Sequence, residues 1–396
     1  MKAIYLDNAA TTKVDSEVYK NMKPYFEIEY GNPSSIYELG LNAKAAIRNS
    51  RQKIAAIIGS NSEEIIFTGS GTESDNLAIF GIARASKNIG NHIISSPIEH
   101  PAVLECLKKL ETEGFEISYL KVDSSGFVNP EDLAREIKDS TILVSIMFGN
   151  NEIGTIEPIE QIGQKLEEIN KERMKNNMGR IYFHTDACQA AGFIKLNVNK
   201  LKIDAMTING SKIYGPKGIG FLYIRNNTPI EPIIYGGKQE NGIRSGTENV
   251  AGIVGLAKAF EIAQENSKKY FDQIYELKKY FIDCVKKRID RIILNSDFEN
   301  CLPSILSISF LDIEGESALL LLDQKGIYCS TGSACTAKSL KPSHALKAIG
   351  LKDEIIHGTL RFSFGKYNSK EEIDYVISEL AIVVDNLRKI SPIHIN

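Results

Sequence analysis

The sequence lacks a long apolar run, a strong net charge and closely spaced cysteines. No apolar stretch approaches the roughly 20 residues that cross a bilayer, and a charge at Asp7 precedes any signal-peptide core, so we expect a cytoplasmic protein with no membrane partner. A formal net charge of −3 gives no global attraction to nucleic acid. The six cysteines include no Cys-x-x-Cys pair, so we expect neither a disulfide framework nor a metal site.

The apolar pattern that is present alternates between short strands and helices. A chain of 396 residues, 43% of them apolar, is long enough for two packed cores, and it shows no evident internal repeat. The alternation favours an α/β fold with an open, mainly parallel sheet whose ligands bind at the carboxyl ends of its strands. We expect seven strands, at residues 65–68, 92–95, 117–122, 142–148, 181–184, 205–208 and 219–224.

The pattern changes after residue 250. A long helical run covers residues 251–289. Beyond it, strands at 304–310 and 359–364 and an amphipathic helix at 370–389 predict a smaller C-terminal α/β domain. The small polar residues at 329–339 have neither helical nor strand periodicity, and they predict a mobile loop.

Lys212 lies on a glycine-rich turn, residues 209–220, between two predicted buried strands. Lysine is mostly exposed in proteins, so a solvated loop lysine is the ordinary interpretation of this residue taken alone. The alternative is a lysine whose amine forms a Schiff base with a carbonyl cofactor, which requires companion residues elsewhere. The remaining motifs decide between the two.

A glycine-rich segment that opens a helix offers one such companion. Gly71 and Thr72 follow the strand at 65–68, and the free amides and hydroxyls at this position can bind a phosphate group. Taken alone, the segment fits a capped helix after a tight turn equally well.

Two further strands end in polar residues. Asp186 follows the strand at 181–184 and is placed to pair with a protonated ring nitrogen, although a helix cap is the commoner role for such a residue. Gln189 can donate to a phenolic oxygen of the same ring. His184 lies within the strand, and we interpret it as a hydrogen-bonded core histidine.

His100 and Asn151 also follow predicted strands. An imidazole at His100 can stack on a flat cofactor or move protons near neutral pH, and the Asn151 amide can donate to a substrate or cofactor. Neither residue would indicate a site by itself.

Cys335 is the cysteine best placed for a reactive thiolate. Glycine, serine, threonine and alanine surround it, and the tether from Cys329 could let it swing roughly 20 Å. This suits a carrier of a chemical group, whereas the plain alternative is an exposed thiol without a role.

Together these residues resemble those of the cysteine desulfurases of the NifS/IscS type, in the class-V aminotransferase family of fold-type-I pyridoxal-phosphate enzymes. The resemblance runs nearly end to end and covers ordered motifs at residues 6–12, 72–76, 99–100, 150–154, 184–186, 212–218, 244–247, 332–336 and 361–363. It implies a large cofactor-binding domain with the seven-stranded sheet. We expect that domain at 16–257, and a small domain formed by 1–15 with 258–396, which carries the Cys335 loop.

The resemblance implies how pyridoxal 5′-phosphate is bound. Lys212 holds it covalently, Asp186 pairs with the pyridinium nitrogen, Gln189 bonds the phenolate and His100 stacks on the ring. The phosphate group is bound by the following residues, the last of them from the second subunit of a homodimer: Gly71, Thr72, Asn209, Ser211 and Thr247.

The resemblance also implies a reaction. Arg361 and Asn151 hold the carboxylate of L-cysteine, and Lys212, once freed, moves the Cα proton. Cys335 attacks the substrate sulfur, becomes a persulfide as alanine is released, and passes the sulfur to a scaffold or carrier protein. Iron–sulfur assembly, tRNA thiolation and DNA phosphorothioation all use such enzymes.

One departure from the family pattern concerns the phosphate site. The family has serine and histidine before its lysine, where this chain has Asn209 and Ser211, and both can still donate hydrogen bonds. Two alternatives therefore stay open: another fold-type-I reaction, such as an aminotransferase or a selenocysteine lyase, and a catalytically silent sulfur-relay protein.

Overall fold

The computed structural model describes residues 3–331, 342–392 and 395. Its large sheet has the seven strands that the sequence predicts, in the order β2-β8-β7-β6-β5-β3-β4. Only β8 runs against the others, because it pairs antiparallel with both β2 and β7, so the prediction of a mainly parallel sheet is confirmed. The strands are β2 (Ile65–Thr68), β3 (His92–Ser95), β4 (Glu116–Tyr119), β5 (Thr141–Ser145), β6 (Tyr182–Asp186), β7 (Ala205–Asn209) and β8 (Gly220–Ile224).

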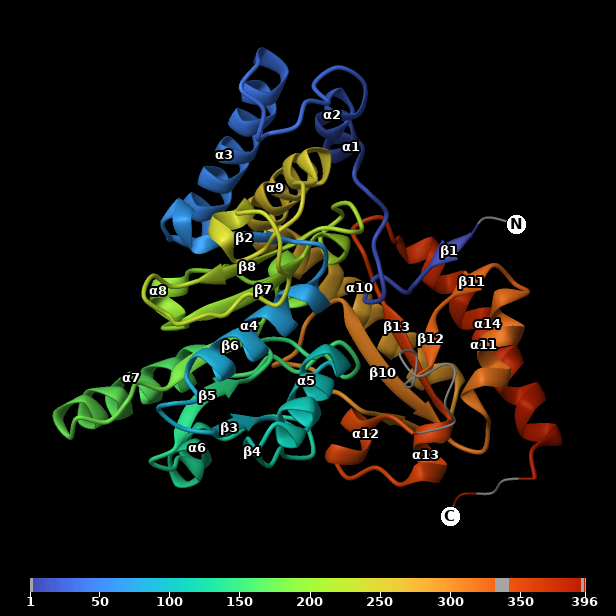
Figure 1. Ribbon diagram of the computed structural model, residues 1–396. Coiled ribbons are helices and arrows are strands. Elements are labelled where there is room, and N and C mark those ends of the chain that lie inside the picture. Colours follow the sequence, from blue (N-terminus) through green and yellow to red (C-terminus); the bar gives the residue numbers. More distant parts are fainter. Residues whose placement is uncertain (1–2, 332–341, 393–394, 396) are drawn as a thin grey trace.

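Alternating side chains bury both faces of this sheet. In β2, Ile65 and Phe67 face one core and Ile66 faces the other, as the period of two along a strand requires. Figure 1 shows helices on both sides of the sheet. One core contains α4 (Gly71–Ala85) and α5 (Pro101–Thr112). The other contains α1 (Ser16–Met22), α3 (Glu38–Ile58), α6 (Pro130–Glu136), α7 (Ile159–Lys175), α8 (Val198–Leu201) and α9 (Val250–Glu265).

The predicted helical run at 251–289 is two helices. Asn266 interrupts it, because its backbone (φ −101°, ψ 7°) ends α9 and begins α10 (Ser267–Arg288) in a new direction. The short α2 (Pro24–Glu27) lies beside α1. The chain also has four single turns of 3-10 helix: η1 (Ser62–Glu64) before β2, η2 (Ala190–Gly192) after β6, η3 (Gly210–Lys212) after β7 and η4 (Gln239–Gly242) between β8 and α9.

A second core surrounds a four-stranded antiparallel sheet of order β12-β13-β10-β9. Its strands are β9 (Ile292–Leu294), β10 (Ile305–Phe310), β12 (Ser330–Thr331) and β13 (Thr359–Ser363). Its helices are α10, α11 (Gly315–Asp323), α12 (His344–Ala348), α13 (Asp353–His357) and α14 (Lys370–Ile390). The prediction of a loop at 329–339 is wrong for its first residues, because Ser330 and Thr331 form a strand that pairs with β13.

The N-terminal strand joins this second part of the molecule (Figure 1). β1 (Ile4–Tyr5) pairs in parallel with β11 (Ile327–Tyr328), so the start of the chain lies beside a strand more than 300 residues later in the sequence. The domain limits at 16–257, and at 1–15 with 258–396, stay a prediction.

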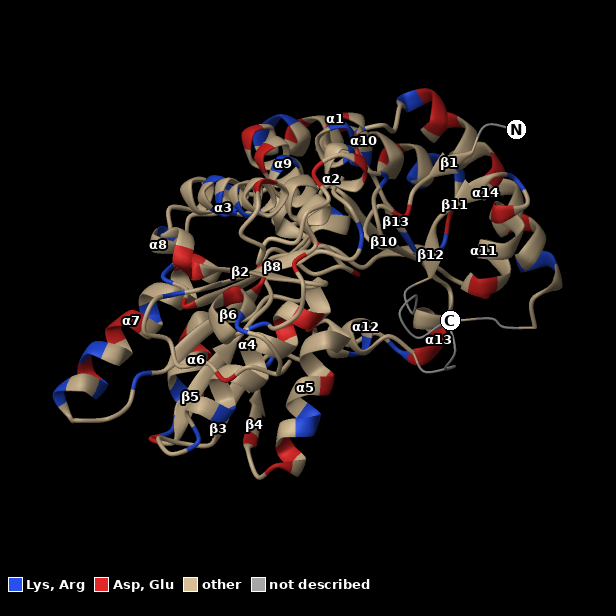
Figure 2. Cartoon of the chain, turned by 45° about the horizontal axis from the view of Figure 1, so that its top comes forward, with Lys and Arg blue, Asp and Glu red and all other residues tan. Residues whose placement is uncertain are grey.

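Charged side chains of both signs are interspersed along the outer helices, as α7 shows in Figure 2. None of the helices in the described part of the chain combines the length and apolar character that a bilayer crossing requires.

Candidate active site

Lys212 ends the turn η3, directly after β7. Asn209, the last residue of β7, caps this turn with Oδ1, which accepts hydrogen bonds from the amide and the hydroxyl of Ser211 at 3.2 Å each. Gly210 admits no side chain, because a Cβ would lie 2.9 Å from the carbonyl oxygen of Pro216. The local sequence therefore fixes the backbone from which the half-buried Lys212 side chain extends.

The Lys212 amine and the Gln189 amide meet at one carbonyl group. Lys212 Nζ donates to the carbonyl oxygens of Ala9 and Ala10 at 2.7 Å each, and Gln189 Nε2 donates to that of Ala9 at 3.0 Å. The ends of β6 and β7 thus converge on the N-terminal segment. A lysine anchored in this way is not an ordinary solvated loop lysine.

The end of β6 places a carboxylate next to this convergence. Asp186 is buried, and its Oδ1 accepts a hydrogen bond from the Cys188 amide at 2.9 Å. His184 on the same strand is fully buried, with Nδ1 2.9 Å from Ser145 Oγ and Nε2 3.1 Å from Thr207 Oγ1. Burial lowers the pKa of His184 to about 4, so the ring is neutral at pH 7. The interpretation of His184 as a core histidine is confirmed.

A second carboxyl group lies behind His184. Asp75 in α4 is buried, and its Oδ1 is 3.6 Å from His184 Nε2. Burial, and then the charge of Asp186, raise the pKa of Asp75 well above the usual range. Among the described residues, Asp75 Oδ1 has no hydrogen-bond partner.

His100 caps the start of α5, with Nδ1 accepting a hydrogen bond from the Ala102 amide at 3.1 Å. This leaves Nε2 as the nitrogen that carries the proton in the neutral ring. Burial lowers the pKa of His100, the nearby Asp186 raises it, and Lys212 lowers it.

Gly71 opens α4 where it meets the ends of β6 and β7. A Cβ at this position would lie 3.0 Å from Cys188 Sγ and 3.2 Å from the Cβ of Asn209, so only glycine leaves the approach to the helix amides open. Ser70 caps α4 through its hydroxyl, and Thr72 is exposed in the first turn. The first turn of α4, next to Asn209, therefore offers backbone amides and the Thr72 hydroxyl to an anion.

Arg361 brings a buried cation to the same region from β13. Its Nη1 donates to the carbonyl oxygen of Asn151 at 3.0 Å, and its Nη2 donates to Asp7 Oδ1 at 2.9 Å. Arg361 Nε is buried without a hydrogen-bond partner in the described part of the chain. A guanidinium group in this state is suited to a carboxylate ligand, which can accept from it.

Three predicted site residues lie differently from the rest. Asn151 reaches Arg361 through its main-chain carbonyl, whereas the prediction invoked its side-chain amide. Thr247 is exposed, three residues after Arg244, whose Nε donates to Glu73 Oε1 at 2.7 Å. Cys335 lies outside the described residues.

The described chain on both sides of the Cys335 segment contacts the site. Ser330, which is paired with Arg361 across the small sheet, donates through its hydroxyl to Asp7 Oδ1 at 2.9 Å. On the other side, His344 Nε2 lies 2.8 Å from the carbonyl oxygen of Glu99.

Reasoning from the sequence assigned no role to Asp7, Asp75 or Glu99. Glu99 is fully buried, and burial raises its pKa to about 8 although Ser96 and the Met147 amide donate to Oε1. All three belong to motifs that carry the family resemblance. Their burial and their partners, however, depend on strand pairings that no local pattern indicates.

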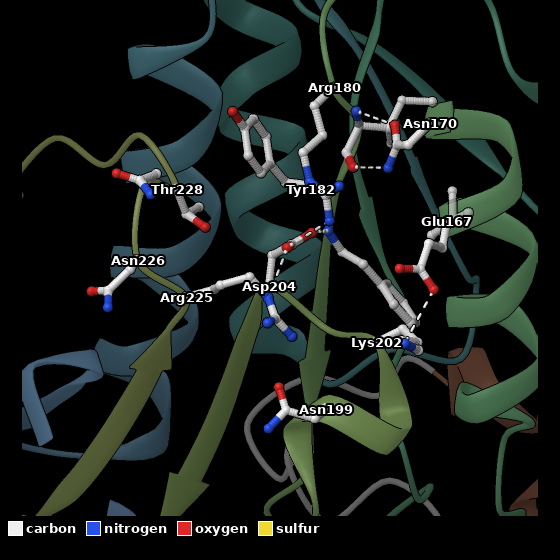
Figure 3. Close-up of a pocket in the computed structure, with 14 residues that line it drawn as sticks. Glu167, Asn170, Arg180, Tyr182, Asn199, Lys202, Asp204, Arg225, Asn226 and Thr228 are labelled. Atoms are coloured by element: carbon white, nitrogen blue, oxygen red, sulfur yellow. Dashed lines mark hydrogen bonds and ion pairs between the residues drawn. The ribbon is translucent and has the colours of Figure 1, made fainter. Parts of the chain in front are cut away.

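A cavity of about 400 Å³ lies at the opposite edge of the large sheet (Figure 3). It is lined by residues at the amino ends of β6 and β7, and its charges are paired. Arg180 Nη2 is 3.0 Å and Arg225 Nε 3.3 Å from Asp204 Oδ1, and Lys202 Nζ is 3.3 Å from Glu167 Oε2. None of the predicted site residues lines this cavity.

Known proteins resemble the chain over nearly its whole length. The Aminotransferase class-V family model matches residues 4–376. The cysteine desulfurase IscS of Dictyoglomus turgidum is 49% identical over 391 residues, which are 99% of this chain and 97% of that protein. Among solved structures, a NifS-like protein has 37% identity and a TM-score of 0.90, with 98% of this chain and 100% of that chain covered. SspA in complex with cysteine has 34% identity and a TM-score of 0.79, with 92% and 100% covered.

The site fits the cofactor of this family. It offers a lysine amine for a carbonyl carbon, a buried carboxylate for a pyridinium nitrogen, and an anion pocket that a side chain at Gly71 would fill. Together with the end-to-end matches, this geometry shows that the chain belongs to the class-V aminotransferase family, as a pyridoxal-phosphate-dependent cysteine desulfurase of the NifS/IscS type.

Proposed function

We propose that the enzyme takes sulfur from L-cysteine onto Cys335 and releases L-alanine. The observation that carries this proposal is the pairing of Ser330 with Arg361. It starts the segment that bears Cys335 beside the buried guanidinium group that is best placed to hold a substrate carboxylate.

Four residues hold the cofactor ring. Lys212 binds its carbonyl carbon through the amine, Asp186 pairs with the ring nitrogen, Gln189 donates to the phenolic oxygen and His100 stacks on the ring. Pyridoxal phosphate supplies an electron sink for a carbanion at the substrate Cα, and a protonated ring nitrogen strengthens it. Asp186 keeps that nitrogen protonated, because a buried carboxylate favours an adjacent cation.

The phosphate group lies against the start of α4. Gly71 and Thr72 donate through the first turn of the helix, and Asn209 and Ser211 donate in place of the serine and histidine that the family has here. In a homodimer, Thr247 of the partner subunit completes the site. The exposure of this residue in the single chain is consistent with that assignment.

The substrate is held by its carboxylate and deprotonated at Cα. Arg361 donates to the carboxylate through Nε, which has no other partner among the described residues, and the Asn151 side chain donates to the same group. The Lys212 amine would move the Cα proton of the bound substrate. The neutral imidazole of His100 would serve as a proton carrier near the substrate thiol.

Cys335 reacts in its thiolate form and receives the sulfur of the substrate. It attacks the substrate sulfur, a sulfur–sulfur bond forms as the bond from sulfur to the substrate Cβ breaks, and the Cβ carbon takes up a proton to give alanine. The persulfide then passes to a scaffold or carrier protein in the cytoplasm. Iron–sulfur assembly, tRNA thiolation and DNA phosphorothioation are the three candidate uses of this sulfur.

The test compares Cys335→Ala with Cys284→Ala, a change at a half-buried cysteine outside the site. We expect Cys335→Ala to lose persulfide and alanine production from L-cysteine by more than about 100-fold while keeping the cofactor absorbance. The Cys284→Ala variant should retain both. Unchanged sulfide release by Cys335→Ala, or activity with selenocysteine alone, would contradict the proposal and favour a selenocysteine lyase.

A further inference from the structure

A buried lysine contacts a buried cysteine away from the active site. Lys278 in α10 and Cys301 have no exposed surface, and Lys278 Nζ lies 2.7 Å from Cys301 Sγ. That is the separation of a charge-assisted bond between nitrogen and oxygen, although sulfur is the larger atom. Lys278 Nζ also donates to the carbonyl oxygen of Leu302 at 3.2 Å. The desulfurase mechanism uses neither side chain.

The contact distinguishes Cys301 from three other buried thiols. Burial raises the pKa of Cys106 and of Cys329 to about 12 and that of Cys188 well above its usual range, so these thiols stay protonated. A cation in contact with a thiol favours the thiolate, which is the reactive form. Burial lowers the pKa of Lys278, although the neighbouring Cys301 raises it.

The cover over Cys301 is thin. Cys301 Sγ is 3.6 Å from the carbonyl oxygen of Phe298, and the Phe298 ring lies 4.9 Å from that of Tyr275, which lies one helical turn before Lys278. Glu299 and Asn300, the residues directly before Cys301, are exposed. The chain next to Cys301 therefore reaches the surface within two residues.

The pair also connects α10 to the substrate side of the active site. Cys301 pairs with Thr155 in an isolated bridge, and the Leu302 amide donates to the carbonyl oxygen of Gly154 at 2.7 Å. These residues follow Asn151, whose carbonyl oxygen holds Arg361. α10 itself packs on the four-stranded sheet that carries Arg361 (Figure 1).

We propose that Lys278 and Cys301 form a covalent sulfur–nitrogen cross-link when the protein meets a peroxide. The Cys301 thiolate attacks one peroxide oxygen, the oxygen–oxygen bond breaks, and a sulfenic acid and one water result. The Lys278 amine then attacks Sγ, so that a sulfur–nitrogen bond forms and the sulfur–oxygen bond breaks, with a second water leaving. Sulfur is oxidised by two electrons and the peroxide is reduced to water. A thiol reductant reverses the link by attack on Sγ.

The test treats the full-length holoenzyme with hydrogen peroxide and maps its peptides by mass spectrometry. We expect a peptide pair joined at Lys278 and Cys301, about 2 Da lighter than the sum of its reduced parts and restored by a thiol reductant. Cys106, buried without such a contact in this structure, serves as the internal control. Cys301 should be consumed at least about tenfold faster than Cys106.

Two variants separate the roles of the side chains. Lys278→Met keeps the length of the side chain without the amine, and Cys301→Ala removes the thiol, and either change should abolish the joined peptides. The cross-linked protein should also melt at a temperature about 2 °C or more above that of the unmodified protein. Recovery of Cys301 unmodified, or as a sulfinic acid without any joined peptide, would overturn the proposal, and so would equal oxidation of Cys301 and Cys106. These readouts do not depend on desulfurase activity.

Discussion

Buried polar groups differ in their partners between the two edges of the large sheet, where the amino ends and the carboxyl ends of its strands lie. At the amino edge, Asp204 is shared between Arg180 and Arg225, and the charges that line the 400 Å³ cavity are paired. At the carboxyl edge, polar atoms of Asp75, Glu99 and Arg361 are buried without a hydrogen-bond partner among the described residues. The cavity of about 400 Å³ lies at the amino edge, whereas the predicted site residues lie at the carboxyl edge.

This contrast separates a stabilising site from a binding site. A buried polar atom without a partner costs about 1–3 kcal/mol, so a fold keeps several of them together only where a ligand completes them. Paired charges, by contrast, are already satisfied and gain little from a ligand. The unpaired atoms at the carboxyl edge therefore indicate the ligand site better than cavity volume does.

The largest expected effect is the loss of activity in Lys212→Ala. Removal of the amine takes away both the covalent attachment of the cofactor and the base for the Cα proton, so alanine production should fall by more than about 1000-fold. Absorbance of the cofactor and alanine release measure the two losses. Lys202→Ala at the amino edge is the matched control and should change activity less than twofold. Equal losses in the two variants would break the contrast between the edges.

Arg361→Lys should have the next largest effect. A lysine keeps the charge but loses the guanidinium fork, and we expect kcat/KM for L-cysteine to fall by about 10 to 100-fold, mainly through KM. The corresponding change at the amino edge, Arg225→Lys, should leave KM unaltered. If KM of the Arg361→Lys enzyme stayed at the wild-type value, the carboxylate would have to bind elsewhere.

Asp204→Asn should affect stability and leave the activity of each folded molecule unchanged. The substitution leaves the two guanidinium groups without their shared carboxylate, and the free energy of unfolding should fall by about 2 kcal/mol. Urea denaturation followed by circular dichroism measures the change. A fall in kcat of the folded protein would show that the amino edge also serves the reaction.

His184 should produce the smallest effect, a dependence of stability on pH. The pKa of His184 is about 4 in the folded protein against 6.5 as reference, so between these values the unfolded chain binds a proton that the folded one does not. Stability therefore falls as the pH drops, by about 1 kcal/mol from pH 6 to pH 5. Glu99, with its raised pKa, acts in the opposite direction between its reference value of 4.5 and about 8.

The variant His184→Gln isolates the histidine from this background. From pH 6 to pH 5, the change in its unfolding free energy should be about 1 kcal/mol less destabilising than the change in the wild type, whereas His357→Gln, at an exposed histidine, should follow the wild type. Parallel curves for His184→Gln and wild type would show that His184 is already protonated in the folded protein.

Much of the fold and the order of the site residues could be predicted from the sequence. Strand periodicity placed all seven strands of the large sheet, and it placed Asp186, His100 and Lys212 at or after the carboxyl ends of strands, where the structure has them. The break at Asn266 was missed because it depends on the backbone conformation of one residue, which leaves no local pattern. The strand at Ser330 was missed because its pairing partner lies 31 positions away.

The sequence by itself determined the family and the cofactor and predicted the lysine, since these follow from motifs whose members are close together in the chain. Only the tertiary structure decided that Gln189 and Lys212 meet at the Ala9 carbonyl, that Asp7 holds Arg361, and that Lys278 lies against Cys301. These contacts join residues 23 to 354 positions apart. The packing of the two cores and the pairing of distant strands create these contacts. Neither can be deduced from the order of the residues along the chain.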